Sequence, residues 1–325
     1  MAEYKHQVIE TAYTPTSDGT YTWDLPTEPI SHLIVRVKCL NAGSNTKATL
    51  AQILGAVEKI EIANPDFTVF SLTGFEMYVL SCLLLGHDIW QENVINTDNA
   101  VRVVPLIIPF GKKLYNPHEC YPAQPKAETN LKITYDIADT GYDNLSFHIE
   151  AVTLPDANPT QYIRATRKRK TPSATGEDDV DFSTGIIYRG ILMYSTTIRS
   201  GTSDTNTIDY VKLLLDNKEH YISQAYWEEL HAQLMLRLSP TYFWANHFHM
   251  ENTASSYTQN ADTESDELSA TTLGHYAYID FDPTGDDSYL LDTTNVGDMK
   301  LRVSFGDTNE AVFIPVELVK LGGGR

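Results

Sequence analysis

Two segments of the chain, 168 residues apart, read almost the same. Residues 130–140 are NLKITYDIADT and residues 298–308 are DMKLRVSFGDT. Both place apolar residues at alternate positions, carry a lysine after the first apolar residue and end in Asp-Thr. Alternation of this kind predicts a β-strand with one buried face. We expect each segment to fill the core of a separate sandwich, with these inward faces: Leu131, Ile133, Tyr135 and Ile137; Met299, Leu301, Val303 and Phe305.

Further matches in the same order indicate that the whole chain is duplicated. One constant shift of 153 residues aligns a strand, a turn, a second strand and a helix start, and shifts of 171, 168 and 167 align the later strands. Collinear matches of this kind indicate an internal repeat rather than chance similarity between strands. The aligned pairs include Arg36 with Arg189, Ile60 with Leu213, Ile62 with Leu215, Glu76 with Glu229, Phe110 with Phe281, and Phe147 with Ile314.

Most of the chain is predicted to be strand, with one helix in each half. The first helix is expected over residues 74–85, between a Thr73 N-cap and a Gly86 stop, and the second over residues 226–238. Pro105 and Pro109 in the run VRVVPLIIPF predict an edge strand, a bulge or a strand end. The strands expected in the first half cover residues 32–40, 57–62, 67–72, 101–110, 131–137 and 145–154.

The predicted fold class is all-β, with two tandem eight-stranded jelly-roll barrels that each contain one helix. A strand-rich unit of about 150 residues whose strands are not in simple hairpin order is typical of a Greek-key sandwich or jelly roll. The expected domains are residues 1–154, a linker over residues 155–183, and residues 184–325. The second copy also carries a long polar insertion, residues 239–274, in the loop after its helix.

Composition narrows the function. The formal net charge of −19 disfavours unspecific binding to nucleic acid, because phosphates are repelled. The three cysteines have no metal-type spacing, which fits a reducing place of synthesis. The first 24 residues hold no continuous apolar core, so no secretory signal is expected there.

With the duplication, the paired helices, the proline-containing strand and the long second-copy loop, the sequence resembles the double jelly-roll major capsid proteins of tailless icosahedral viruses. Its short length is most similar to the membrane-containing bacterial virus members, of the corticovirus and finnlakevirus types. The resemblance covers about residues 30–321. No single residue signature defines this family, so no functional residue is transferred.

The resemblance implies a structural protein of the virion, made in the host cytoplasm. Three two-barrel chains would form a pseudo-hexameric homotrimer that tiles an icosahedral shell. The implied partners are neighbouring capsomers, penton and minor capsid proteins, and an internal viral membrane, with no sequence-specific nucleic-acid binding. The 239–274 loop is the best candidate for a surface tower. At its base, Tyr242, Phe243 and Trp244 predict a subunit interface, with simple core packing as the alternative.

Two motifs in the sequence are weak candidates for a metal site. His247 and His249 would point the same way on a strand and could share a metal, but the glycine frame of a cupin is missing. Asp280 and Asp282 resemble the start of a calcium loop whose twelfth residue is Leu291 in place of the usual glutamate. A solvated turn is the simpler interpretation, so no cofactor is expected and calcium stays open.

The stretch Arg164 to Lys170 is the strongest positive feature of an acidic chain. Its basic residues could face anionic lipid headgroups or a packaged genome, or could form a solvated linker balanced by the acidic run that follows. We favour the linker. The cluster consists of Arg164, Arg167, Lys168, Arg169 and Lys170.

The alternative function is a two-domain jelly-roll carbohydrate-active enzyme, lectin or bicupin, because a fold alone does not determine function. A bicupin would repeat the His-x-His motif, and the first copy has no match to His247 and His249. Nucleophile elbows, phosphate loops and dinucleotide fingerprints are absent from the sequence. The sequence therefore predicts a protein that is not an enzyme.

Overall fold

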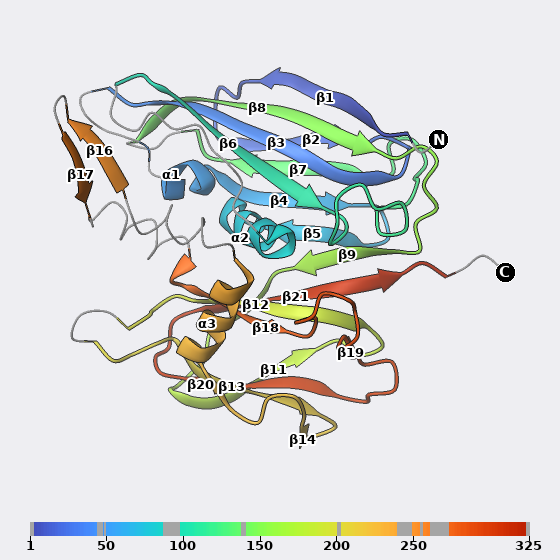
Figure 1. Ribbon diagram of the computed structural model, residues 1–325, viewed down its shortest axis with the longest axis vertical. Coiled ribbons are helices and arrows are strands. Elements are labelled where there is room, and N and C mark those ends of the chain that lie inside the picture. Colours follow the sequence, from blue (N-terminus) through green and yellow to red (C-terminus); the bar gives the residue numbers. More distant parts are fainter. Residues whose placement is uncertain are drawn as a thin grey trace. The chain divides into compact units, whose positions relative to one another are not determined.

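The structure is a computed structural model of the whole chain (Figure 1). It describes residues 3–43, 48, 50–86, 98–137, 141–199, 203–238, 249–253, 256–260 and 273–322. The chain divides into two compact units. Unit 1 contains Met1–Arg164 and the C-terminal Lys320–Arg325, and unit 2 contains Ala165–Ser239 and Asn246–Val319; Pro240–Ala245 is also assigned to unit 1.

Unit 1 is a sandwich of two sheets. One sheet has the order β1-β8-β3-β6 and the other contains β5-β4-β7-β2. The proline-containing strand β6 lies at a sheet edge, as the sequence predicted. The strands are β1 (Lys5–Tyr13), β2 (Gly19–Asp24), β3 (Ile30–Asn41), β4 (Val57–Ala63), β5 (Thr68–Leu72), β6 (Val101–Pro109), β7 (Asn130–Tyr135) and β8 (Tyr142–Thr153).

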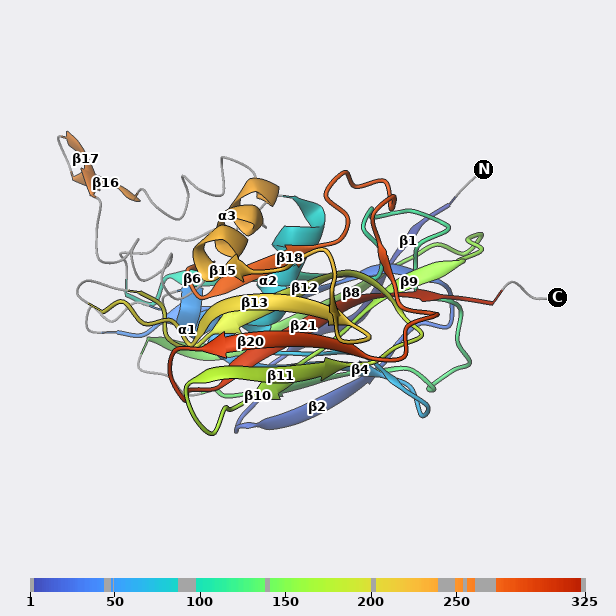
Figure 2. The ribbon, with the colours of Figure 1, turned by 90° about the horizontal axis from the view of Figure 1, so that it is seen from below.

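Unit 2 repeats this topology. In one sheet β21 pairs with β10 and β12, and β12 pairs with β18 and with the short β19. In the other sheet the order is β11-β20-β13-β14, and β15 also pairs with β13 (Figure 2). The strands are β10 (Lys168–Lys170), β11 (Gly176–Phe182), β12 (Ile187–Ser195), β13 (Ile208–Leu215), β14 (Lys218–Glu219), β15 (Ala225–Tyr226), β18 (Tyr276–Asp280), β19 (Leu291–Asp292), β20 (Met299–Phe305) and β21 (Ala311–Lys320).

In both units the first strand pairs with the last, in one sheet, and the second strand pairs with the second-last, in the other sheet. This is the jelly-roll order. The prediction of two tandem jelly rolls is confirmed.

Strand register confirms the repeat at the two opening segments. In unit 1, Ile60 of β4 lies opposite Ile133 of β7. In unit 2, the residues matched to them by the sequence shifts, Leu213 and Leu301, also lie opposite one another. The same holds for the pair Ile62 and Leu131 and for the pair Leu215 and Met299.

The match of Arg36 with Arg189 is wrong in register. Arg36 lies within β3 opposite His148 and is exposed. Arg189 lies at a register shift between Tyr188 and Gly190 of β12, and it is buried. A β-bulge at this point of the second copy adds a residue that a constant shift cannot follow.

The helices begin at matched positions. Helix α2 (Gly74–Leu85) starts after Thr73, whose hydroxyl accepts from the Glu76 N–H while the Glu76 carboxylate accepts from the Thr73 N–H at 2.8 Å. Helix α3 (Trp227–Arg237) starts after Tyr226, whose N–H donates to the Glu229 carboxylate at 3.1 Å. The predicted ends of α2 are confirmed, with Gly86 in the left-handed conformation.

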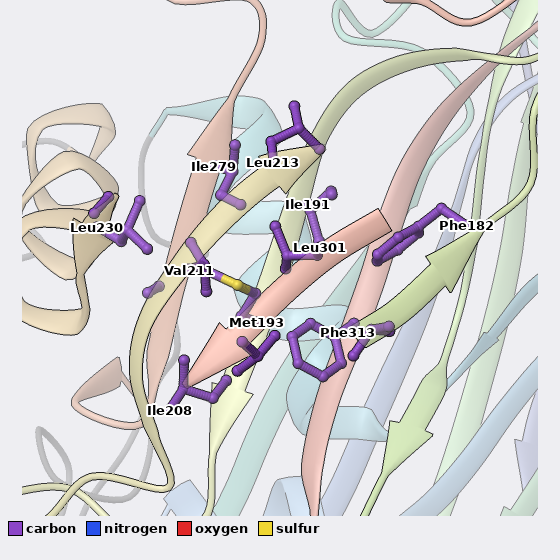
Figure 3. Close-up of a cluster of buried hydrophobic side chains, with 14 of the residues drawn as sticks. Phe182, Ile191, Met193, Ile208, Val211, Leu213, Leu230, Ile279, Leu301 and Phe313 are labelled. Carbon is purple, nitrogen blue, oxygen red and sulfur yellow. The ribbon is translucent and has the colours of Figure 1, made fainter. Parts of the chain in front are cut away.

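Each late strand fills the core of its own unit. Leu131, Ile133 and Tyr135 of β7 are buried, whereas Ile137 lies beyond the end of the strand and is half-buried. All four predicted residues of β20 are buried in the core of unit 2. Figure 3 shows side chains from both sheets and Leu230 of α3 contributing to that core.

Several elements differ from the sequence prediction. Strands β1 and β2 and the short helix α1 (Leu50–Gly55) were not predicted, because their apolar residues are few or their length is short. The expected linker, residues 155–183, is corrected, since it contains β9 (Gln161–Thr166), β10 and β11. Its charged residues are strand residues whose side chains pair across the sheet, a pattern that resembles a solvated linker in sequence. Within the 239–274 insertion the structure describes a hairpin of β16 (His249–Thr253) and β17 (Ser256–Asn260).

Of the glycines in the described part of the chain, Gly190 has the least room for a side chain. A Cβ built there would lie 2.0 Å from the Tyr278 hydroxyl oxygen and 2.5 Å from the Ile279 carbonyl oxygen. We expect Gly190→Ala to lower the free energy of unfolding by about 1–3 kcal/mol, because strand β18 must move away. Urea unfolding measures this, with Gly55→Ala as the control because nothing lies within 4 Å of its Cβ position. Equal stability of the two variants would contradict the packing at the bulge.

Candidate functional site

The acidic and basic side chains of the described residues form ion pairs rather than a metal cluster. Among them, no group of three or more His, Cys, Asp or Glu residues is placed to hold a metal ion. The three cysteines, Cys39, Cys82 and Cys120, are buried. Burial raises the pKa of the Cys39 and Cys120 thiols to about 11, so both remain protonated at neutral pH.

The candidate calcium loop is built around two arginines. Arg237 at the end of α3 donates two hydrogen bonds to the Asp280 carboxylate, at 2.5 and 2.7 Å. Arg189 at the β12 bulge donates to Asp282 at 3.0 Å, and both of these side chains are almost fully buried. Bidentate and charge-assisted bonds of this kind are the strong ones. Asp280 and Asp282 therefore fasten α3 and β12 to the end of β18.

The remaining oxygens of this loop are also engaged. Asp282 Oδ1 accepts from the Asp287 N–H at 3.0 Å, and Asp287 approaches Arg189 at 3.0 Å. Hydrogen bonds from Thr284 and Ser288 hold the pKa of the exposed Asp286 carboxyl at about 2. The geometry is that of an ion-paired turn, and calcium binding here stays an untested prediction.

The histidine motif is only partly described. His247 lies outside the described residues, and His249 begins strand β16. His275 donates from Nδ1 to the Ser195 carbonyl at 2.7 Å, and its ring stacks on Tyr194. His275 therefore ties the start of β18 to β12.

The basic cluster lies on β9 and β10 and faces acidic neighbours. Lys170 Nζ is 2.7 Å from Asp178 and donates to the Asp179 carbonyl, and Lys168 donates to the Asp181 carbonyl. Arg167 and Arg169 both approach Glu310, at 4.0 and 3.7 Å. Arg164 lies in β9. In unit 2, Arg167, Arg169 and Lys170 therefore lie beside acidic side chains, and the role of the cluster stays a prediction.

A charged sheet face in unit 2 was missed from the sequence. On β11, β20 and β13, Asp179 accepts two bonds from Arg302 at 2.8 and 3.1 Å, and Glu177 accepts from Lys212 and Tyr210, each at 2.8 Å. Arg302 lowers the pKa of Asp179, and Lys212 lowers that of Glu177. In the sequence, β11 and β20 carry charged residues at alternate positions. Which of these residues pair with one another depends on the pairing of the strands.

The predicted interface aromatics Tyr242, Phe243 and Trp244 lie outside the described residues. None of the helices in the described part of the chain is long and apolar enough to cross a membrane.

Comparison with proteins of known structure shows which fold the chain has. No protein-family model matches the chain, and no curated protein sequence matches it. Among solved structures, the major capsid protein of the Sulfolobus turreted icosahedral virus, STIV, has a TM-score of 0.67 at 15% identity, over 98% of this chain and 97% of that chain. The major capsid protein P2 from bacteriophage PM2 has a TM-score of 0.60 at 10% identity, over 98% of each chain. The faustovirus major capsid protein has a TM-score of 0.54 at 8% identity, over 99% and 90%.

The chain therefore has the double jelly-roll fold of these major capsid proteins. The similarity extends over nearly the full length of both chains for the first two of these structures, one from a Sulfolobus virus and one from a bacteriophage. It supports the double jelly-roll type without selecting the bacterial membrane-containing type.

Removal of the buried Asp282 charge should be costly. We expect Asp282→Asn to lower the free energy of unfolding by up to about 3–5 kcal/mol, because it removes the buried carboxylate that pairs with Arg189 and leaves the more exposed Asp287. Asp286→Asn, in the same loop but exposed, should change stability far less. Denaturant unfolding of both variants at neutral pH compares them. A similar loss in the two variants would show that the buried ion pair is not what stabilises the turn.

Proposed function

We propose that this chain is a major capsid protein that assembles as a homotrimer and tiles an icosahedral virus shell. The observation that carries the proposal is the duplicated jelly roll, matched over 97–98% of the length of two capsid proteins. A single chain with two similar units offers six such units in a trimer, which suits a site of near six-fold symmetry.

The side-chain chemistry is consistent with a structural role. Two buried charged groups, Arg189 and Asp282, bind each other, and Arg237 binds Asp280. Paired groups of this kind stabilise a turn, whereas an acid–base catalyst needs a group free to exchange a proton with a substrate. The similar solved structures are named as capsid proteins, and we infer the same class of role for this chain.

Partners follow from this proposal. We infer contacts with neighbouring capsomers and, more specifically, with penton and minor capsid proteins. The net charge of −19 favours a membrane or a basic protein between the shell and the genome. The 239–274 insertion remains our candidate for the tower, and the virion, after synthesis in the host cytoplasm, is the inferred location.

The purified chain should form a stable trimer or shell-like particles. Light scattering after size exclusion should give three times the 36.5 kDa chain mass, and electron microscopy should show particles where assembly continues. Replacement of Tyr242, Phe243 and Trp244 by serine should shift the mass towards that of one chain if these aromatics lie at the interface. A wild-type monomer that binds a sugar or metal stoichiometrically would instead favour the lectin or bicupin alternative.

The isolated trimer should bind DNA weakly. Because the chain is strongly acidic, phosphate contacts are disfavoured over most of its surface. Fluorescence anisotropy with a random duplex at 50 and 200 mM salt should show no tight binding at either concentration. Tight binding that weakens steeply with salt would contradict an intervening layer, while leaving the trimer and the shell role intact.

A further inference from the structure

Strand β1 of unit 1 pairs irregularly with its neighbour β8. It lies at a sheet edge, and its residues are exposed or half-buried along the whole length. Its pairing with β8 is interrupted twice, between Val8 and Glu10 and between Glu10 and Tyr13. The second interruption leaves Thr11 without a ladder partner, which weakens the attachment of the centre of the strand.

Side chains replace the missing ladder bonds at this bulge. The Thr11 N–H donates to the Glu10 carboxylate at 3.0 Å. The Thr11 carbonyl oxygen lies 3.0 Å from His148 Nδ1, and the other ring nitrogen of His148, Nε2, lies 2.7 Å from Glu150 Oε1. His6, on β1, approaches the second oxygen of the same carboxylate at 3.2 Å.

The bonding of His148 requires a proton on both ring nitrogens. A backbone carbonyl and a carboxylate are both acceptors, so each ring nitrogen of His148 must donate. Neutral imidazole has one N–H, and only the imidazolium has two. His148 therefore forms both hydrogen bonds, to the Thr11 carbonyl and to the Glu150 carboxylate, only when it is charged.

We propose that β1 is a proton-sensitive strap: protonated His148 fastens its bulged centre to β8, and loss of that proton releases the centre of the strand. The ends of the strap are held by other contacts. Lys5 pairs with Glu28 at 3.2 Å, and the Tyr13 and Tyr135 hydroxyls lie 2.7 Å apart. Release would expose the backbone edge of β8, a surface to which an extended segment of another chain can add.

The charged groups around His148 set the direction of the effect. Glu150 on β8 favours the proton, whereas Arg36, directly opposite on β3, disfavours it. Lys5, His6 and Glu10 lie on β1, and Lys38 follows Arg36 on β3. The strands β1 and β3 pair on either side of β8, and the cross-strand residue from β6 opposite Arg36 is the uncharged Pro105.

The sign follows from the two partners. The hydrogen bond to Glu150 raises the pKa of His148, so the stabilisation is complete below the ordinary histidine pKa of about 6.5 and is lost as pH rises through the higher folded value. The bond from His148 lowers the pKa of Glu150, so its contribution is lost only as pH falls below the ordinary range of glutamate. The strap should be firmest in mildly acidic solution.

Hydrogen exchange of residues 5–13 between pH 6 and pH 8 tests the proposal in the full-length protein. After correction for intrinsic exchange, protection of β1 in the wild type should fall as pH rises, by up to about tenfold per pH unit for one linked proton. In His148→Gln the protection should stay at the low, high-pH level of the wild type. The matched control is His118→Gln, an exposed histidine of unit 1 that should keep the wild-type profile.

Two results would overturn the proposal. One is a His148→Gln profile that follows the wild type. The other, which needs no variant, is an NMR titration of wild-type His148 with a pKa at or below the usual 6.5 or so. If His148→Gln does not fold, Glu150→Gln provides the same test, because it removes the carboxylate while keeping the size of the side chain. A flat profile in the wild type would also overturn the strap, whatever the oligomeric state.

Discussion

The burial of one apolar face by each late strand is the interaction on which both units depend. Strand β7 lies between β2 and β4, and β20 lies between β11 and β13, so each late strand is central to its sheet. Leu301 in β20 and Ile133 in β7 are fully buried at matched positions. Truncation of such a residue typically costs 2–5 kcal/mol, a large part of the stability of a domain. A one-residue slip of either strand would turn this whole face to solvent, which is why its pattern survives in both copies.

At the bulge in β12, where unit 2 differs from unit 1, buried ion pairs replace apolar contacts. The bulge at Tyr188 and Gly190 turns Arg189 into the interior, and a buried arginine requires a partner. Asp282 provides that partner, and Arg237 with Asp280 extends the same arrangement to α3. Arg36 of unit 1, which the sequence aligns with Arg189, is exposed on a regular strand. The bulge therefore explains both the buried ions and the failure of the constant shift.

The parts of the fold that were predicted from the sequence are those fixed by local pattern. The cap at Thr73, the stop at Gly86 and the alternation in β7 and β20 are each determined within a few residues. Strands β1 and β10 were missed because their side chains are mostly exposed, so pairing with β8 and β21 decides their structure. The ion pair of Arg189 and the hydrogen bond of His148 to the Thr11 carbonyl were missed for a related reason. Their partners, Asp282 and Thr11, are 93 and 137 residues away, and only the folded register brings them together.

The same cross-strand position shows how the two copies have diverged. In unit 1, Thr20 of β2 and Thr134 of β7 lie opposite each other and share a hydrogen bond of 2.9 Å. In unit 2 the corresponding pair is Asp179 and Arg302, which form a bidentate ion pair. Both pairs face outward, where cross-strand pairs contribute only modestly to stability, so either choice is compatible with the frame. The duplicated core thus constrains shape while leaving the outer faces free to differ. In the proposed trimer, six units with similar cores would therefore present two outer faces that differ in their cross-strand pairs.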